Sequence, residues 1–181
     1  IDGHKVMEIF CQDTKLNLSR YYLKPGYAFG GSCLPKDVRA LNYAARSRDV
    51  ETPLLCSVLT ANEVHIQRGI DMILETGKQR VGILGFSFKA GTDDLRESPL
   101  VRIIETLIGK GRDLRLYDRN VQTARLVGAN KDYIMHRIPH IARLMVNSID
   151  EVLAYADVVV VGNGDPAFAS VYDRLRPGQQ M

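Results

Sequence analysis

The residues best suited to chemistry surround Cys33, in the segment FGGSCLPKD at 29–37. Two adjacent glycines permit close backbone approach, and Pro35 is typical of the first turn of a helix. A cysteine just before a helix lies at its positive end, and Lys36 adds a second positive charge, so the reactive thiolate form is favoured. Asp37 can hold a water or accept a proton. Cys33 is a candidate nucleophile, and a structural cysteine in a glycine turn is the alternative.

Upstream of this cysteine, the segment NLSRYYLKPGY at 17–27 concentrates tyrosines, cations and hydroxyl groups. Tyrosine hydroxyls suit the hydroxyls of a sugar, and a cation suits a diphosphate. The alternative is a solvated loop whose tyrosines cover a core edge. The residues by themselves leave both interpretations open.

The first part of the chain, residues 1–78, is predicted to be helical around one long loop at 21–34. One helix opens at Pro35. A longer helix follows Pro53 and carries a mostly apolar stripe, interpreted as core packing: Leu54, Leu55, Val58, Leu59, Asn62, Ile66, Ile70, Ile73 and Leu74.

The second part, residues 79–181, alternates predicted strands and helices. The apolar runs at 80–85, 114–118 and 156–161 are typical of buried parallel strands. Between the first two, Ser98 and Pro99 predict the start of a helix that Gly111 ends. This strand-helix-strand unit is a parallel crossover, so the fold class is α/β, with a helical segment followed by a Rossmann-like doubly wound sheet. Ligands of such sheets lie beyond the carboxyl ends of the strands, at 86–97, Asp118 and 162–165.

Two further patterns carry little weight. The turn GNGDPA at 162–167 follows a strand, but it lacks the other glycines and the ribose-binding acid of a dinucleotide fingerprint. His136 and His140 have the spacing of metal ligands on a helix, but Pro139 lies between them and no further ligand clusters there. The sequence therefore predicts no metal site.

The composition excludes several function classes. A net charge of +3 without a basic block argues against nucleic acid as a partner. No apolar stretch is long enough for a membrane span and no signal peptide opens the chain, which favours a cytoplasmic protein. Three cysteines at unrelated spacings argue against a disulfide framework. Both ends of the sequence look like cuts through a longer protein.

The segment at 29–37, together with FKAGTDDLRESP at 88–99, resembles the paired signatures of the UDP-glucose and GDP-mannose dehydrogenases. The order and separation of the two strings also match, and the resemblance covers essentially the whole chain. It implies an NAD-dependent, four-electron oxidation of a sugar C6 alcohol to a carboxylate, through a thiohemiacetal and a thioester of Cys33. The product would serve exopolysaccharides such as alginate.

The resemblance also assigns roles to individual residues. Asp37 would assist Cys33 with water and protons, while Lys36 and Arg96 would lie near NAD. The nucleotide sugar would contact residues on both sides of the cysteine, partly across a homo-oligomer interface: Tyr21, Tyr22, Lys24, Tyr27, Gly30 and Lys89. For Lys89 and Arg96 the alternative is ordinary surface charge.

The chain also departs from the family pattern. The family begins with a glycine-fingerprint NAD domain and a helix bearing a catalytic lysine and asparagine, and this sequence starts after both. The piece alone is therefore expected to be inactive. The strings at 19–28 and 162–165 look like the GDP-mannose branch. A UDP-glucose dehydrogenase and a non-catalytic nucleotide-binding or oligomerisation module are the alternatives.

Overall fold

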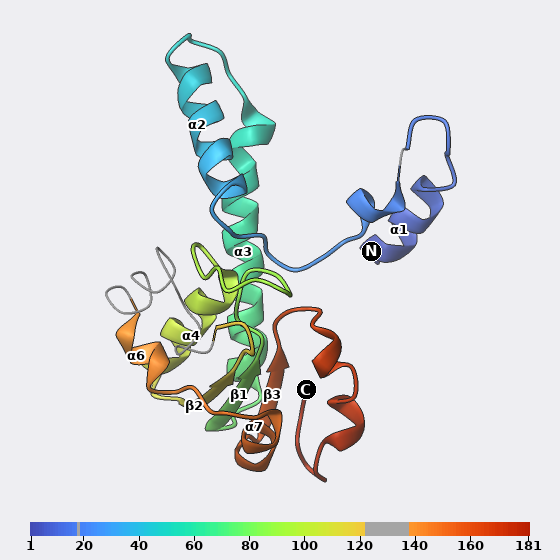
Figure 1. Cartoon of the computed structure of the whole chain (residues 1–181). Coiled ribbons are helices and arrows are strands. Elements are labelled where there is room, and N and C mark those ends of the chain that lie inside the picture. Colours follow the sequence, from blue (N-terminus) through green and yellow to red (C-terminus); the bar gives the residue numbers. More distant parts are fainter. Residues whose placement is uncertain (18, 122–137) are drawn as a thin grey trace.

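The computed structural model describes residues 1–17, 19–121 and 138–181 of the 181-residue chain. Its upper part is helical and its lower part is a small parallel sheet covered by helices (Figure 1). Within the described ranges, no helix combines the length and apolarity needed to cross a membrane.

The helical part begins with the short helix α1 (Gly3–Phe10), which Asp2 caps by accepting the amide of His4 at 2.9 Å. None of the α1 residues is buried, and Figure 1 shows the helix standing apart from the rest of the molecule. The 3-10 helix η1 (Arg20–Leu23) lies beside it, and an extended stretch leads from there to the cysteine loop.

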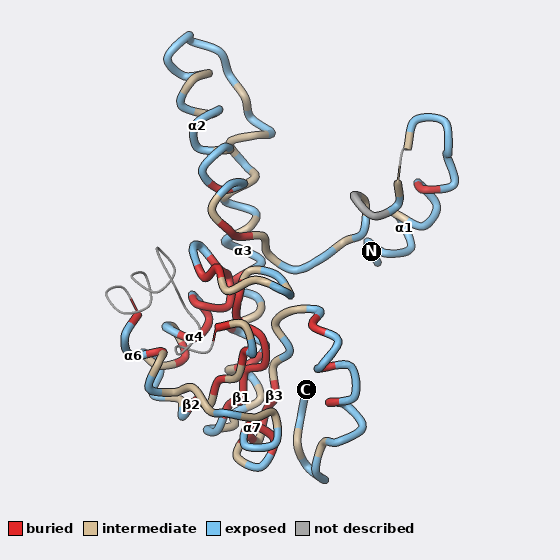
Figure 2. The backbone as a smooth tube through the Cα atoms, viewed as in Figure 1, coloured by how far each residue is buried: buried red, intermediate tan, exposed pale blue. Residues whose placement is uncertain are grey.

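The next two helices form an antiparallel pair, α2 (Leu34–Arg46) and α3 (Pro53–Glu75). The first half of α3 packs on α2 and stays largely exposed (Figure 2). Its second half contributes Ile66, Ile70 and Ile73 to the main core beside the sheet. Each such side chain contributes roughly 1.5–3 kcal/mol by burial, so α3 ties the helical part to the sheet.

The sheet has three parallel strands in the order β2 (Asp113–Tyr117), β1 (Arg80–Leu84) and β3 (Val158–Val161). Single parallel bridges extend it at both edges, from Leu116 to Met145 and from Val158 to Gln180. The central strand is the first in sequence and its neighbours are reached by crossovers, which is the doubly wound arrangement. The predicted fold class is confirmed.

Helices cover both faces of this sheet. On one face, α3 and α4 (Pro99–Gly109) enclose the larger core cluster; on the other, α7 (Ile149–Tyr155) encloses the smaller one. Gly82 permits the close approach of α7, because a Cβ there would meet Ala156 at 2.9 Å. Among the described residues, the remaining short helices are α6 (Pro139–Ala142), η3 (Pro166–Phe168) and η4 (Tyr172–Arg174).

Two details differ from the sequence-based expectations. The strand predicted at 156–161 begins only at Val158, because Ala156 still ends α7, a helix that the sequence patterns above do not include. Ser98 occupies the N-cap position of α4, but its hydroxyl donates to the carbonyl of Phe86 at 2.8 Å instead of capping the helix. Ser98 therefore ties the loop after β1 to α4.

Candidate functional site

Cys33 occupies the N-cap position of α2 and is exposed. Its carbonyl accepts the amide of Asp37 at 2.9 Å, the first hydrogen bond of the helix, and Pro35 is buried beneath it. Its Sγ lies 3.8 Å from the Ser32 hydroxyl. The unpaired amides of a helix N-terminus carry partial positive charge. The thiol is therefore accessible and lies at the positive end of α2.

The two glycines before Cys33 pack directly on the loop that precedes α4. A Cβ at Gly30 would overlap the carbonyl oxygen of Glu97 and approach Cδ of Pro99 to 2.7 Å. Gly31 has a φ of +90° and donates its amide to the carbonyl of Arg96 at 3.2 Å. The two motifs singled out in the sequence, 29–37 and 88–99, thus form one surface.

Two charged pairs border this surface. Arg39 of α2 donates to the Glu97 carboxylate at 2.9 and 2.5 Å, which lowers the pKa of Glu97. Arg96 donates to the nearly buried Asp94 through its backbone amide and side chain, at 2.8–2.9 Å, and lowers the pKa of Asp94. The hydrogen bonds to the Asp94 carboxylate, together with its negative charge, raise the pKa of Arg96. Asp94 therefore fixes the position of the Arg96 cation in the loop that Gly31 contacts.

The other predicted residues of this loop surface are exposed. Lys36 forms an ion pair with Asp37 at 3.3 Å, and both side chains are about two-thirds exposed. Lys89 has its ammonium 5.6 Å from the ring centroid of the adjacent Phe88. That ring in turn lies against Gly31, where a Cβ would come within 3.0 Å of it. The structure thus brings Cys33, Lys36, Asp37 and the 88–97 loop together.

The predicted tyrosine-rich segment is only partly joined to this surface. Tyr21 and Tyr22 are in η1, which Figure 1 shows beside α1 and well apart from α2; Lys24 follows on the extended stretch and is exposed. Tyr27 instead lies along α3, where its hydroxyl donates to the Ile66 carbonyl at 3.1 Å. Partial burial raises the pKa of Tyr27. Within this chain, Tyr21, Tyr22 and Lys24 are not gathered around Cys33.

Two contributors to this surface were missed in the sequence. The sequence places Asn62 in the apolar stripe of α3, yet its side-chain amide forms hydrogen bonds with both the N–H and the carbonyl of Phe29. Its polarity within an otherwise apolar stripe was the available signal. Arg39 carried no signal, because ordinary surface charge looks the same in sequence.

At the carboxyl edge of the sheet, the other expected place for a ligand, several polar groups are engaged in contacts within the protein. The Asp118 carboxylate accepts the amides of Phe86 and Ser87 at 3.0 and 3.1 Å. Arg119 pairs with the buried Asp165 at 2.8 Å. A Cβ at Gly162 would overlap the Gly85 carbonyl, so this glycine serves packing rather than approach to a phosphate. The 162–167 turn shows no dinucleotide cradle.

The two histidines with metal-ligand spacing, His136 and His140, are only partly covered by the structure. His140 lies 3.8 Å from Glu105, while His136 lies outside the described residues. Across the part of the chain that the structure describes, no three His, Cys, Asp or Glu side chains gather as metal ligands.

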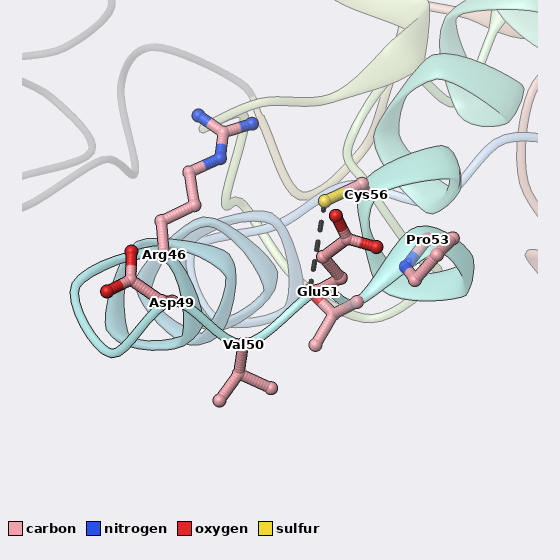
Figure 3. Close-up of a pocket in the computed structure, with 7 residues that line it drawn as sticks. Arg46, Asp49, Val50, Glu51, Pro53 and Cys56 are labelled. Atoms are coloured by element: carbon pink, nitrogen blue, oxygen red, sulfur yellow. Dashed lines mark hydrogen bonds between the residues drawn. The ribbon is translucent and has the colours of Figure 1, made fainter.

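The other two cysteines lie away from the glycine loop. Cys11 is buried at the end of α1. Cys56 is in the first turn of α3, at the far end of the α2–α3 pair from Cys33, with its Sγ near Thr52 and Asn42. Figure 3 shows the hollow around it, lined by the α2–α3 turn. Neither cysteine shares the helix N-terminus and glycine contacts of Cys33.

Fold and site together define a Rossmann-like α/β protein with an accessible cysteine between its helical and sheet parts. The model for the UDP-glucose/GDP-mannose dehydrogenase family, UDP binding domain, matches residues 82–179, and the model for the central domain of that family matches residues 1–64. The chain belongs to the UDP-glucose/GDP-mannose dehydrogenase family, and the resemblance seen in the sequence is confirmed.

Individual relatives agree with this assignment. GDP-mannose 6-dehydrogenase of Pseudomonas aeruginosa is 55% identical over all of this chain, which spans 42% of that protein. The structure of a ternary complex of GDP-mannose dehydrogenase from the same species matches with a TM-score of 0.85 and 56% identity, covering 99% of this chain and 41% of that one. UDP-glucose 6-dehydrogenase of Haloferax volcanii is 33% identical over 97% of this chain and 38% of its own length.

Proposed function

We propose that the protein containing this chain is an NAD-dependent nucleotide-sugar 6-dehydrogenase that oxidises C6 of GDP-mannose to the carboxylate, giving GDP-mannuronate. The observation that carries this proposal is the accessible Cys33 at the N-terminus of α2, packed against the loop that holds Arg96. The identity of 55% to a GDP-mannose 6-dehydrogenase over the whole chain supports the reaction class and the substrate.

Cys33 is the proposed nucleophile. Its thiolate adds to the aldehyde carbon formed in the first oxidation, so that a C–S bond gives a thiohemiacetal. The second oxidation converts this adduct to a thioester, and water then breaks the C–S bond to release the carboxylate and the thiol. Asp37, exposed in the first turn of α2, is placed to accept the proton of that water.

The cofactor contacts of this chain are limited to its loop surface. NAD, when bound, supplies an acceptor for the hydride in each of the two oxidations. Lys36 and Arg96 fit a negatively charged diphosphate, since both are cations beside Cys33 with about half or more of the side chain exposed. We infer that these two residues hold one side of the cofactor.

The nucleotide sugar is proposed to approach from the same side as Lys89. This ammonium is exposed at the end of the β1 loop and suits the substrate diphosphate. Gly30 is buried against Glu97, so any contact with the sugar would be made by its backbone. Tyr27 keeps 46% of its surface exposed, so it remains available for a contact with the substrate.

Tyr21, Tyr22 and Lys24 are proposed to act on a neighbouring subunit. They lie on the segment that Figure 1 shows leading away from Cys33, so they would complete the site of a second copy in a homo-oligomer. The proposed chain consists of two structural units, residues 1–78 and residues 79–181. The proposed location of the protein is the cytoplasm. The boundary falls after α3, although the end of α3 shares the core of the sheet.

A UDP-glucose 6-dehydrogenase is the second candidate, favoured by the relative of that name at 33% identity. The two are separated by offering GDP-mannose and UDP-glucose to the complete enzyme with NAD and identifying each acid by mass spectrometry. We expect kcat/KM for GDP-mannose to be higher by about a hundredfold or more, because unpaired polar groups reject the wrong substrate. Comparable values, or a preference for UDP-glucose, would overturn the choice of substrate.

A further inference from the structure

Asn62 is the one polar group of the α3 stripe that reaches the cysteine loop among the described residues. Its Nδ2 donates to the carbonyl of Phe29 at 2.9 Å, and its Oδ1 accepts the amide of Phe29 at 2.9 Å. Both backbone polar groups of one loop residue are thus bound by a single half-buried side chain. Two such bonds fix the position and the rotation of the loop at Phe29.

The same face of α3 holds the loop at a second point. The hydroxyl of Tyr27 donates to the carbonyl of Ile66, and the tyrosine ring lies over Gly69, where a Cβ would come within 2.9 Å of Cζ. Asn62, Ile66 and Gly69 are spaced by four and three residues, so they share one face of the helix. The loop from Tyr27 to Phe29 therefore lies along α3 and is held by hydrogen bonds to this helix.

The residues between Phe29 and Cys33 are held in place by contacts with the loop before α4. Gly30 is buried against Glu97 and Pro99, and Gly31 is bonded to the Arg96 carbonyl. Cys33 then begins α2. The contacts of Gly30 and Gly31 follow directly on the residue that Asn62 holds, so losing the Asn62 bonds is expected to loosen these contacts and, with them, the loop that carries Cys33.

We propose that Asn62 is a positioning residue for Cys33, acting through the Phe29 backbone without touching the reacting atoms. The inference rests on the proposed function, since Cys33 is its nucleophile. A nucleophile misplaced by about 1 Å can lower a rate about a hundredfold. Substituting Asn62 is therefore expected to affect kcat more than substrate binding.

The matched control is Asn42, a half-buried asparagine of α2 that donates to the carbonyl of Leu55 at 3.2 Å, at the distant end of the helix pair. Asn62→Ala and Asn42→Ala each remove one side-chain amide between helix and backbone. We expect similar losses of thermal stability. Only Asn62→Ala should accelerate hydrogen exchange at the Gly31 amide in this chain, by about fivefold or more.

In the complete enzyme, Asn62→Ala should lower kcat about tenfold or more while KM for GDP-mannose changes by less than about threefold. Asn62→Asp keeps the acceptor for the Phe29 amide and should give a smaller decrease, which also covers the case in which Asn62→Ala does not fold. Unchanged exchange at Gly31, or a kcat equal to that of Asn42→Ala, would overturn the proposal. A wild-type enzyme that oxidises no nucleotide sugar would refute the proposed function instead, and exchange at Gly31 would still decide whether Asn62 holds the loop.

Discussion

Gly30 lies against the carbonyl oxygen of Glu97, so close that the space for a side chain is already filled by that oxygen and by Pro99. The contact joins a loop of the helical part to the loop before α4. We predict that Gly30→Ala destabilises the chain by about 1–3 kcal/mol, because a methyl group there forces backbone to move. The midpoint of urea unfolding measures it. Gly26→Ala is the control, since nothing lies within 4 Å of a Cβ at Gly26; equal midpoints for the two variants would contradict the close contact.

Cys33→Ser in the complete enzyme should lower turnover to the acid by about a thousandfold or more. A serine hydroxyl is a far weaker nucleophile toward the aldehyde carbon, and it cannot form the thioester intermediate. The acid product is followed by mass spectrometry. Cys56→Ser is the control, as this thiol lies in the first turn of α3 at the other end of the helix pair. Normal turnover of Cys33→Ser would remove Cys33 from the mechanism.

Lys89→Ala is expected to raise KM for the nucleotide sugar about tenfold or more, because one charge-assisted hydrogen bond contributes roughly 1.5–3 kcal/mol. The fold should be unaffected, since the side chain is exposed. Lys110→Ala, at the exposed end of α4, is the matched loss of a surface cation. Identical KM values for the two variants would exclude Lys89 from the substrate site.

Acidification should weaken the Asp94–Arg96 pair. The hydrogen bonds from Arg96 lower the pKa of Asp94 in the folded chain, so its contribution to stability is present above the unfolded value of about 4 and is lost as pH falls through the lower folded value. Asp94→Asn should lose stability at neutral pH and show a shallower decline below about pH 4. Urea midpoints between about pH 2 and 6 test this, and parallel curves for variant and wild type would show that the pair does not contribute.

The 181-residue chain alone should bind NAD more weakly than micromolar. Micromolar affinity corresponds to about 8 kcal/mol, more than the exposed Lys36 and Arg96 can supply, and the carboxyl edge of the sheet is occupied by Asp118, Asn163 and Arg119 contacts. Isothermal titration calorimetry measures the affinity. Saturable micromolar binding would mean that this chain holds a cofactor site of its own.

The sequence by itself predicted the main helices and strands, α7 excepted, and identified the family. Apolar periodicity placed the long helix after Pro53 and the strand at 80–85, because a helix face and a buried strand impose different local spacings. Pro35 and Pro99 marked helix starts within one or two residues. The cysteine, glycines and cations of 29–37 and 88–99 identified the family before any contact was known.

Only the tertiary structure decided which of these residues meet. Phe29 and Asn62 are 33 positions apart, and Arg39 and Glu97 are 58 apart. The residue spacings that reveal a helix or a strand describe neighbours along the chain, so they cannot report pairings made by packing α3 beside the sheet. For the same reason Asn62 resembled one more member of a core stripe, and Asp118 resembled a ligand contact. Their partners are set by the tertiary fold, because hydrogen bonds and close packing depend on distance in space and not on distance along the sequence.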